Sequence, residues 1–134
     1  MCRSGEALEI GRRFARRVFL IAGVYGIVVL LPQYFAEWAV DLPAPIAQPE
    51  QFYGFIGVAL AWQVVFLVIA RDVQRYRPLM LAGVLEKLSF GVPVIILYAA
   101  GRVSAGVLAA GVVDLAFGGL FVLAFVRSRE KAAS

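Results

Sequence analysis

The sequence predicts an all-α polytopic membrane protein, with four transmembrane helices in an antiparallel bundle and both termini in the cytoplasm. Of its 134 residues, 62% are hydrophobic and only 16% are charged, whereas an ordinary soluble domain has about 25% charged residues. A fold this small cannot cover its surface with so few polar side chains. The apolar residues also gather in four long runs, which charged or proline-rich segments separate.

The four runs predict spans over residues 18–35, 52–70, 79–100 and 103–126, in a single membrane domain that covers residues 1–134. Each run has about 18–24 residues, close to the ~20 that a helix needs to cross a ~30 Å hydrocarbon core. A backbone in lipid must satisfy its own hydrogen bonds, and no alternation of period two indicates a barrel, so we expect helices.

The segment before the first span, residues 1–17, is rich in arginine and resembles a twin-arginine export signal at Arg16 and Arg17. No small-x-small cleavage site follows the apolar run, so we expect an uncleaved anchor whose arginines contact anionic lipid. Cys2 is the single cysteine, and the chain has no histidine. No internal disulfide, metal site or cofactor is therefore expected.

The connection between the first two spans, residues 37–51, is the longest connection between spans. Pro43, Pro45 and Pro49 keep it extended, and residues 35–40 are predicted as a short turn lying in the interface. The aromatic residues that flank this connection are typical of a membrane-interface belt: Tyr34, Phe35, Trp38, Phe52 and Tyr53.

The basic residues predict the orientation. They lie in residues 1–17, in the link 71–78 and in the tail 127–134, and of the 13 Lys and Arg residues only Lys87 and Arg102 lie elsewhere. The positive-inside rule places these three segments in the cytoplasm, and we expect a multi-pass protein of the bacterial inner membrane. The same distribution explains the net charge of +4. The expected partner of these basic residues is therefore the lipid bilayer and not nucleic acid.

Polar side chains within the spans are candidate functional residues, because a charge in the hydrocarbon region is costly. Glu86 and Lys87 lie in the third span, Asp114 in the fourth, Gln63 in the second and Tyr25 in the first. At 1.5 Å per residue, all five lie roughly 10–20 Å from the cytoplasmic ends of their helices. The four helices therefore present polar groups to one zone of the bundle.

Small residues recur every four positions around two of these charges, and such faces let membrane helices approach closely. We therefore expect Lys87 and Asp114 to form an ion pair, with Glu86 and Gln63 completing the network, although Lys87 could instead extend to the cytoplasmic surface. Pro93 is expected to bend the third span, which is compatible with a cavity or with simple packing. The small residues are Gly83 and Gly91 in the third span, and Gly106, Ala110 and Gly118 in the fourth.

The stretch Arg75-Tyr76-Arg77-Pro78-Leu79-Met80, followed by Gly83-Val84-Leu85-Glu86-Lys87-Leu88, resembles a family signature. With four short spans, cytoplasmic termini, a longer loop after the first span and an acidic residue in a later span, the chain resembles the DoxX-like group of small bacterial membrane proteins. The resemblance implies an accessory role, since some members are subunits or partners of membrane oxidoreductases. This chain has no histidine and no cysteine pair for direct redox chemistry.

The sequence leaves several functions open. The first is a non-enzymatic accessory or small-ligand- or lipid-binding bundle, whose polar cluster either forms a pocket or only fixes the helix register. The alternative is a small proton-coupled transporter that acts as an oligomer through Glu86 or Asp114, although the small multidrug-resistance transporters carry their carboxylate in the first span. An enzyme acting on lipid lacks a nucleophile or metal-ligand set, so no catalytic residue is predicted. Four spans bury few of their faces, which favours a homo-oligomer or a larger membrane complex.

Overall fold

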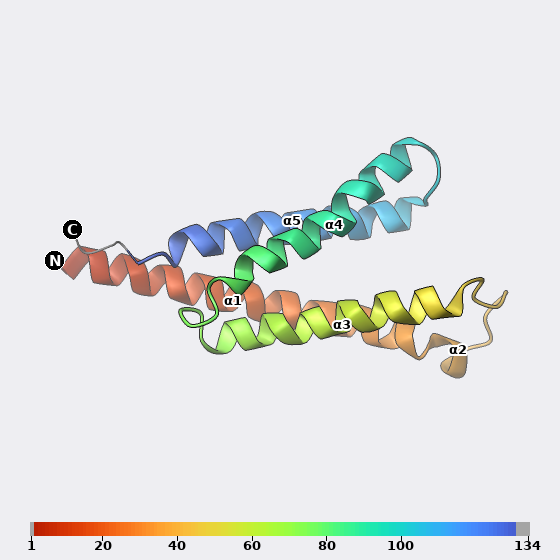
Figure 1. Ribbon diagram of the computed structural model, residues 1–134, viewed down its shortest axis with the longest axis horizontal. Coiled ribbons are helices and arrows are strands. Elements are labelled where there is room, and N and C mark those ends of the chain that lie inside the picture. The colour runs from red at the N-terminus through yellow and green to blue at the C-terminus, as the bar shows by residue number, and fades with distance from the viewer. Residues whose placement is uncertain (1, 131–134) are drawn as a thin grey trace.

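The computed structural model describes residues 2–130, which contain helices and no strand (Figure 1). The all-helical class is confirmed, and four helices are long and apolar enough to cross a membrane, with mean hydropathy between 1.8 and 2.2. The elements are α1 (Cys2–Tyr34), α2 (Ala36–Ala39), α3 (Pro49–Arg71), α4 (Leu79–Ala99) and α5 (Ala105–Arg127). The predicted spans end within two residues of these helices at six of their eight ends, and the exceptions are the beginnings of α1 and α3.

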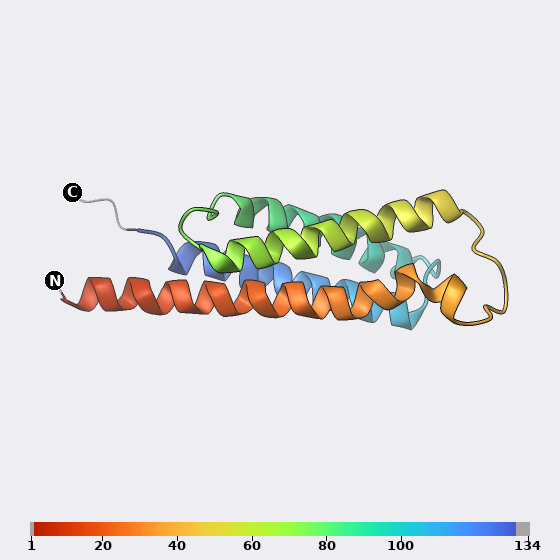
Figure 2. The same ribbon diagram turned by 90° about the horizontal axis from the view of Figure 1, so that it is seen from below.

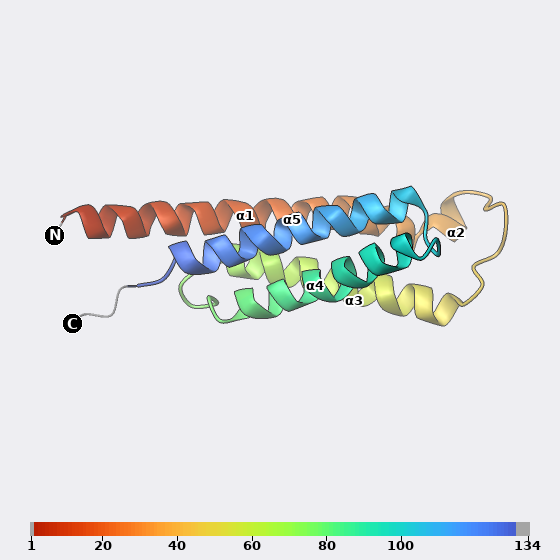
Figure 3. The same ribbon diagram turned by 90° about the horizontal axis from the view of Figure 1, so that it is seen from above.

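Helix α1 is much longer than the predicted first span, because the arginine-rich segment before the span continues the same helix. No proline interrupts this segment, and the Glu9–Arg13 ion pair at 2.5 Å joins side chains one helical turn apart, a spacing that stabilises helices. At 1.5 Å per residue, the 33 residues of α1 extend about 50 Å. Figures 2 and 3 show α1 continuing past the other helices at the end where both termini lie.

The predicted turn over residues 35–40 is found as the short helix α2, at the end of the molecule opposite the termini (Figure 1). Aromatic side chains connect the ends of α1 and α3 here: the ring centroids of Tyr34 and Tyr53 are 5.3 Å apart. The Tyr53 hydroxyl also donates a hydrogen bond to the Glu37 carboxylate. These contacts fix the long connection at both of its ends.

The long helices form two closely packed pairs, α1 with α3 and α4 with α5. Helix α1 also packs along α5, whereas α3 and α4 approach each other at few positions. Figure 1 shows the two pairs meeting at the end that carries both termini and diverging toward the other end, where the second half of α4 turns away from α3. Helix α4 remains continuous through Pro93, whose missing N–H frees the backbone to bend.

Side-chain contacts join the elements at the end where the pairs meet. The Arg77 guanidinium donates from Nη2 to the carbonyl oxygen of Phe125 at 2.7 Å and lies over the Phe125 ring. Gln74 donates to the carbonyl oxygen of Ser128 at 3.1 Å, and Arg12 pairs with Glu130. The carbonyl groups at the end of α5 are thus capped by the link between α3 and α4. Lys131, counted among the basic residues of the tail, lies outside the described residues.

The hydrophobic core lies next to these contacts and is built around three phenylalanines. Phe19, Phe66 and Phe121 are fully buried, and they come from α1, α3 and α5. The centroids of Phe19 and Phe121 are 4.2 Å apart in a stacked arrangement, and the ring of Phe66 meets that of Phe121 edge-on at 4.9 Å. We call these three residues the aromatic plug, because they fill the centre of the molecule where the helix pairs converge.

Glycines allow α4 and α5 to cross closely. A Cβ added at Gly111 would lie 2.6 Å from Val94 Cγ1, and one added at Gly91 would lie 3.0 Å from the carbonyl oxygen of Gly111. A Cβ at Gly119, on another face of α5, would meet nothing within 4 Å. Of the predicted small residues, Gly91 and Gly118 lie at this helix contact. Gly106 and Ala110 do not, because both are exposed and line the cavity described below, and Gly111 makes the close approach instead.

We expect Gly111→Ala to lower the thermal unfolding midpoint, followed by circular dichroism in detergent, with a destabilisation of about 1–3 kcal/mol typical of overpacking. Gly119→Ala places the same methyl group on the same helix in open space and should leave the midpoint unchanged or raise it slightly. Equal midpoints for the two variants would show that α4 and α5 do not cross at Gly111.

Candidate functional site

A cavity of about 990 Å³ lies between the helix pairs and is lined by residues of α1, α3, α4 and α5. It begins where the aromatic plug ends and occupies the part of the molecule in which the two pairs diverge. Its walls are mainly apolar and rich in aromatic rings. Large side chains that form these walls include Val29, Phe55, Trp62, Leu85, Phe90 and Phe117.

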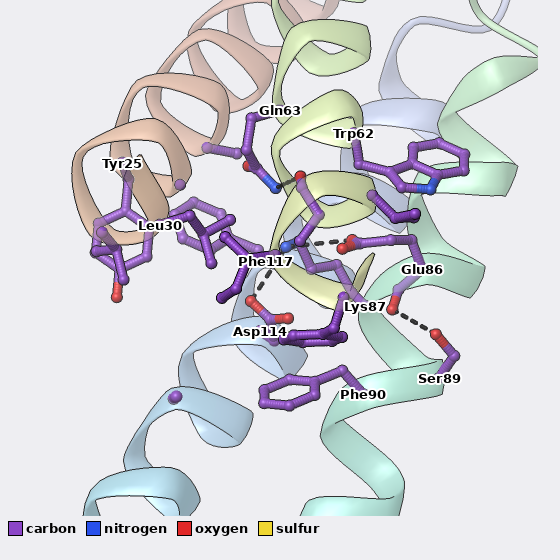
Figure 4. Close-up of a pocket in the computed structure, with 18 of the residues that line it drawn as sticks. Tyr25, Leu30, Trp62, Gln63, Glu86, Lys87, Ser89, Phe90, Asp114 and Phe117 are labelled. Carbon is purple, nitrogen blue, oxygen red and sulfur yellow. Dashed lines mark hydrogen bonds and ion pairs between the residues drawn. The ribbon is translucent and has the colours of Figure 1, made fainter. Parts of the chain in front are cut away.

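Three charged residues lie at the inner end of this cavity, and we call Glu86, Lys87 and Asp114 the charged cluster. The Lys87 ammonium lies 3.1 Å from Asp114 Oδ1 and 3.2 Å from Glu86 Oε2. The Lys87 side chain is only 6% exposed, whereas those of Glu86 and Asp114 keep 16% and 19% exposure. Figure 4 shows the ammonium between the two carboxylates.

The small residues of α4 and α5 position this cluster. Lys87 lies one helical turn from Gly83 and one from Gly91, and all three are buried. The position of an added Cβ at Gly118 on α5 is 3.3 Å from the Lys87 Cβ. The lysine stem therefore packs against the facing helix at a position that has no side chain. Asp114 is one turn before Gly118 on α5 and thus comes within reach of the ammonium.

The predicted ion pair between Lys87 and Asp114 is present. Lys87 does not extend to the end of the molecule that carries the termini, because its ammonium lies between the two carboxylates. It donates a hydrogen bond to Asp114 and lies 5.3 Å from the centroid of the Phe66 ring, a distance typical of a cation–π contact. Glu86 joins the cluster although it is next to Lys87 in the sequence, since the flexible lysine stem brings Nζ back toward the adjacent carboxylate.

Gln63 lines the same cavity but does not complete the hydrogen-bonded network. It is 2% exposed, and its amide Nε2 donates to the carbonyl oxygen of Ala59 on its own helix at 2.9 Å. Its Oε1 accepts no hydrogen bond. Gly26 makes room for this amide, since a Cβ there would lie 2.0 Å from Gln63 Oε1.

Tyr25 also borders the cavity, through its ring and not its hydroxyl. The side chain is 41% exposed, and its ring lies 5.6 Å from that of Phe117. Figure 4 shows the hydroxyl directed away from the charged cluster. Of the five predicted polar residues, the structure therefore joins Glu86, Lys87 and Asp114 directly and places Gln63 and Tyr25 on the surrounding wall.

Sequence reasoning missed the aromatic walls. Trp62 is adjacent to Gln63 and Phe90 follows Glu86 by one helical turn, so both face the cavity (Figure 4). In a chain with 10 Phe residues, nothing distinguishes a ring in a cavity wall from one that faces lipid. The available signal was helical spacing from the intramembrane charges, which predicts Phe90 from Glu86.

The arrangement has the chemistry of a binding site. Within residues 2–130, no group of three or more His, Cys, Asp or Glu side chains is placed to hold a metal ion. The cavity instead combines a large apolar volume with a small set of fixed charges. No family model, curated protein or solved structure matches this chain.

Proposed function

We propose that this membrane protein binds a small amphiphilic ligand, with the apolar body of the ligand in the cavity and its polar end at the charged cluster. The observation that carries the proposal is the cavity of about 990 Å³ that ends at Glu86, Lys87 and Asp114. Ligand pockets in proteins are typically about 300–1,000 Å³, mostly apolar, with a few placed polar groups. Both properties are found here.

The exposure of the carboxylates favours binding over a purely structural role. A network that served only to fix helix register would be enclosed by packing on every side. Glu86 and Asp114 instead line the cavity and keep part of their surface free. Lys87 also lines the cavity but is the least exposed of the three, as expected for a group that holds two carboxylates in place.

We further propose that the chain lies in the bacterial inner membrane with both termini in the cytoplasm. The basic residues support this orientation, since those of α1, of the link before α4 and of the end of α5 lie at one end of the molecule. The cavity then extends from the charged cluster toward the outer surface of the membrane. An accessory role of the DoxX-like kind, in a homo-oligomer or a larger complex, is compatible with such a site and rests on the resemblance of the sequence.

The two tryptophans of the chain provide a direct test of binding. Trp62 lines the cavity, whereas Trp38 is in α2 and is 83% exposed. In lipid nanodiscs, we expect 4-(4-bromophenyl)butan-1-ol to quench the fluorescence of a Trp38→Phe variant saturably, because the bromine enters the cavity beside Trp62. A Trp62→Phe variant, which reports only on Trp38, should show the linear quenching of a probe that partitions into lipid.

Neighbouring alanines of α5 supply the matched control. Ala110 lines the cavity and Ala109 does not. In the Trp38→Phe background, Ala110→Phe should weaken saturable quenching at least tenfold by filling the cavity, and Ala109→Phe should leave it unchanged. Linear quenching in every variant would contradict the proposal.

Transport is a second candidate, favoured by the closure of the cavity at one end. The aromatic plug lies between the charged cluster and the end that carries the termini, so it blocks passage of a ligand from the cluster to that end. Proton-coupled transport by an oligomer would require the plug to open in turn. Accumulation of a bound probe inside proteoliposomes under a proton gradient, lost in Asp114→Asn, would distinguish transport from binding alone.

A further inference from the structure

The wall of the cavity contains a buried hydrogen-bond acceptor that has no donor. Gln63 Oε1 is buried and accepts no hydrogen bond, and its residue lines the cavity. The orientation of the Gln63 amide is fixed, because Nε2 donates to the Ala59 carbonyl and the reverse orientation would bring two oxygen atoms together. Glu86 and Asp114 line the same cavity, and both of their carboxyl groups have the Lys87 ammonium as their charged partner.

The charged groups of the cavity, like its unpartnered oxygen, favour a ligand that donates hydrogen bonds and carries a positive charge. Glu86, Lys87 and Asp114 are the only Asp, Glu, Lys or Arg residues among the described side chains that line it. Two carboxyl groups face one ammonium, so the cluster has one acidic group more than it has basic groups. An anionic ligand would bring a further negative charge next to them in a medium of low dielectric constant, where such repulsion is strong.

The aromatic walls suit a cation next to this cluster. The faces of Trp, Tyr and Phe rings attract positive charge, and the Lys87 ammonium already lies over the Phe66 ring. Trp62 and Phe117 line the cavity on either side of the charged residues (Figure 4). A second cation could therefore be held between carboxylate and ring without leaving the apolar cavity.

We propose that the polar end of the ligand is a protonated amine, an inference that rests on the proposed binding function and specifies its ligand. The ammonium group donates hydrogen bonds to Gln63 Oε1 and to the carboxylates of Glu86 and Asp114. Binding supplies a second cation to the two carboxyl groups and a donor to Gln63 Oε1. The apolar body of the amine then lies along the walls formed by α3 and α5.

Three probes with one body test this proposal: 4-(4-bromophenyl)butan-1-amine, the corresponding butan-1-ol and the corresponding butanoate. Each is titrated at pH 7 into nanodiscs that contain the Trp38→Phe variant, and the saturable quenching of Trp62 gives the dissociation constant. The amine is protonated at this pH, since alkylamines have pKa values near that of lysine. We expect the amine to bind at least tenfold more tightly than the alcohol and the butanoate to show no saturable binding.

Two substitutions test which residues cause the preference for the amine over the alcohol. In the same background, Asp114→Asn should reduce the ratio of alcohol to amine dissociation constants about tenfold, because it removes one of the two carboxylates. Gln63→Met removes one acceptor without changing charge and should reduce the ratio about threefold. Glu50→Gln, a charge removal at the exposed start of α3, is the matched control and should leave the ratio unchanged.

The outcomes distinguish the assignment of an amine from the binding function on which it rests. Saturable binding of the alcohol with equal or weaker binding of the amine would overturn the assignment of an amine and leave the binding function standing. Absence of saturable quenching by all three probes would overturn both. If Asp114→Asn fails to fold, the selectivity of the Trp38→Phe protein and the effect of Gln63→Met still decide the question.

Discussion

Replacing Lys87 with methionine is expected to destabilise the protein by on the order of 3–5 kcal/mol, the usual effect of removing one partner from a buried ion pair. Methionine keeps the length and flexibility of the lysine stem, so packing against Gly118 is retained while the charge is lost. Two carboxylates then face each other without a cation. Thermal unfolding in one detergent, followed by circular dichroism, measures the change.

A double variant tests whether this effect arises from the pair. Asp114→Asn removes one of the two opposed carboxylates, so Lys87→Met combined with Asp114→Asn should be less destabilised than the sum of the single variants, with a coupling of about 1–3 kcal/mol. Simple additivity would indicate that the 3.1 Å contact between Lys87 and Asp114 contributes nothing to stability. The loss in Lys87→Met would then be a packing effect.

Removal of a ring from the aromatic plug is expected to have an effect of similar size. Phe121 is fully buried and contacts both Phe19 and Phe66. Truncation of a buried phenylalanine to alanine costs about 3–5 kcal/mol, because the space it leaves is only partly refilled. We therefore expect Phe121→Ala to lower the unfolding midpoint strongly in the same assay.

Phe55 provides the control for this substitution. It is a phenylalanine of α3 that is 52% exposed and lines the cavity, so Phe55→Ala removes the same atoms from a site that is already open. Its midpoint should fall by much less than that of Phe121→Ala. Comparable losses at both positions would mean that the plug is not the centre of packing.

The four long apolar helices, and the similar depth of the polar residues within them, could be predicted from the sequence because both depend on single helices. A helix in lipid needs an apolar length set by the membrane, and depth along a helix follows from a constant rise. Lys87 and Asp114 could be paired because small residues surrounded both charges at helical spacing. These features depend on one helix or on two consecutive helices.

The remaining features depend on contacts between segments distant in the sequence. The divergence of the two helix pairs results from side-chain contacts at one end, such as the hydrogen bonds of Arg77 to the end of α5, which no local pattern indicates. The orientation of the Gln63 amide depends on the space left by Gly26. Helix α1 exceeded its predicted span because hydropathy marks where lipid lies, and the polar turns beyond it satisfy their hydrogen bonds in water as well.

The loose approach of α3 and α4 affects how a ligand reaches its site. Few residues of these helices come close, and side chains beside this seam, Val58 and Leu85, line the cavity and are 62% and 67% exposed. An amphiphile dissolved in the bilayer can thus enter sideways without first returning to water. Its supply is governed by its partition coefficient between water and lipid. Each added CH₂ group makes the free energy of transfer into lipid more favourable by ~0.8 kcal/mol. Selectivity among homologous compounds would then be exercised partly by the membrane, with the protein recognising mainly the polar end.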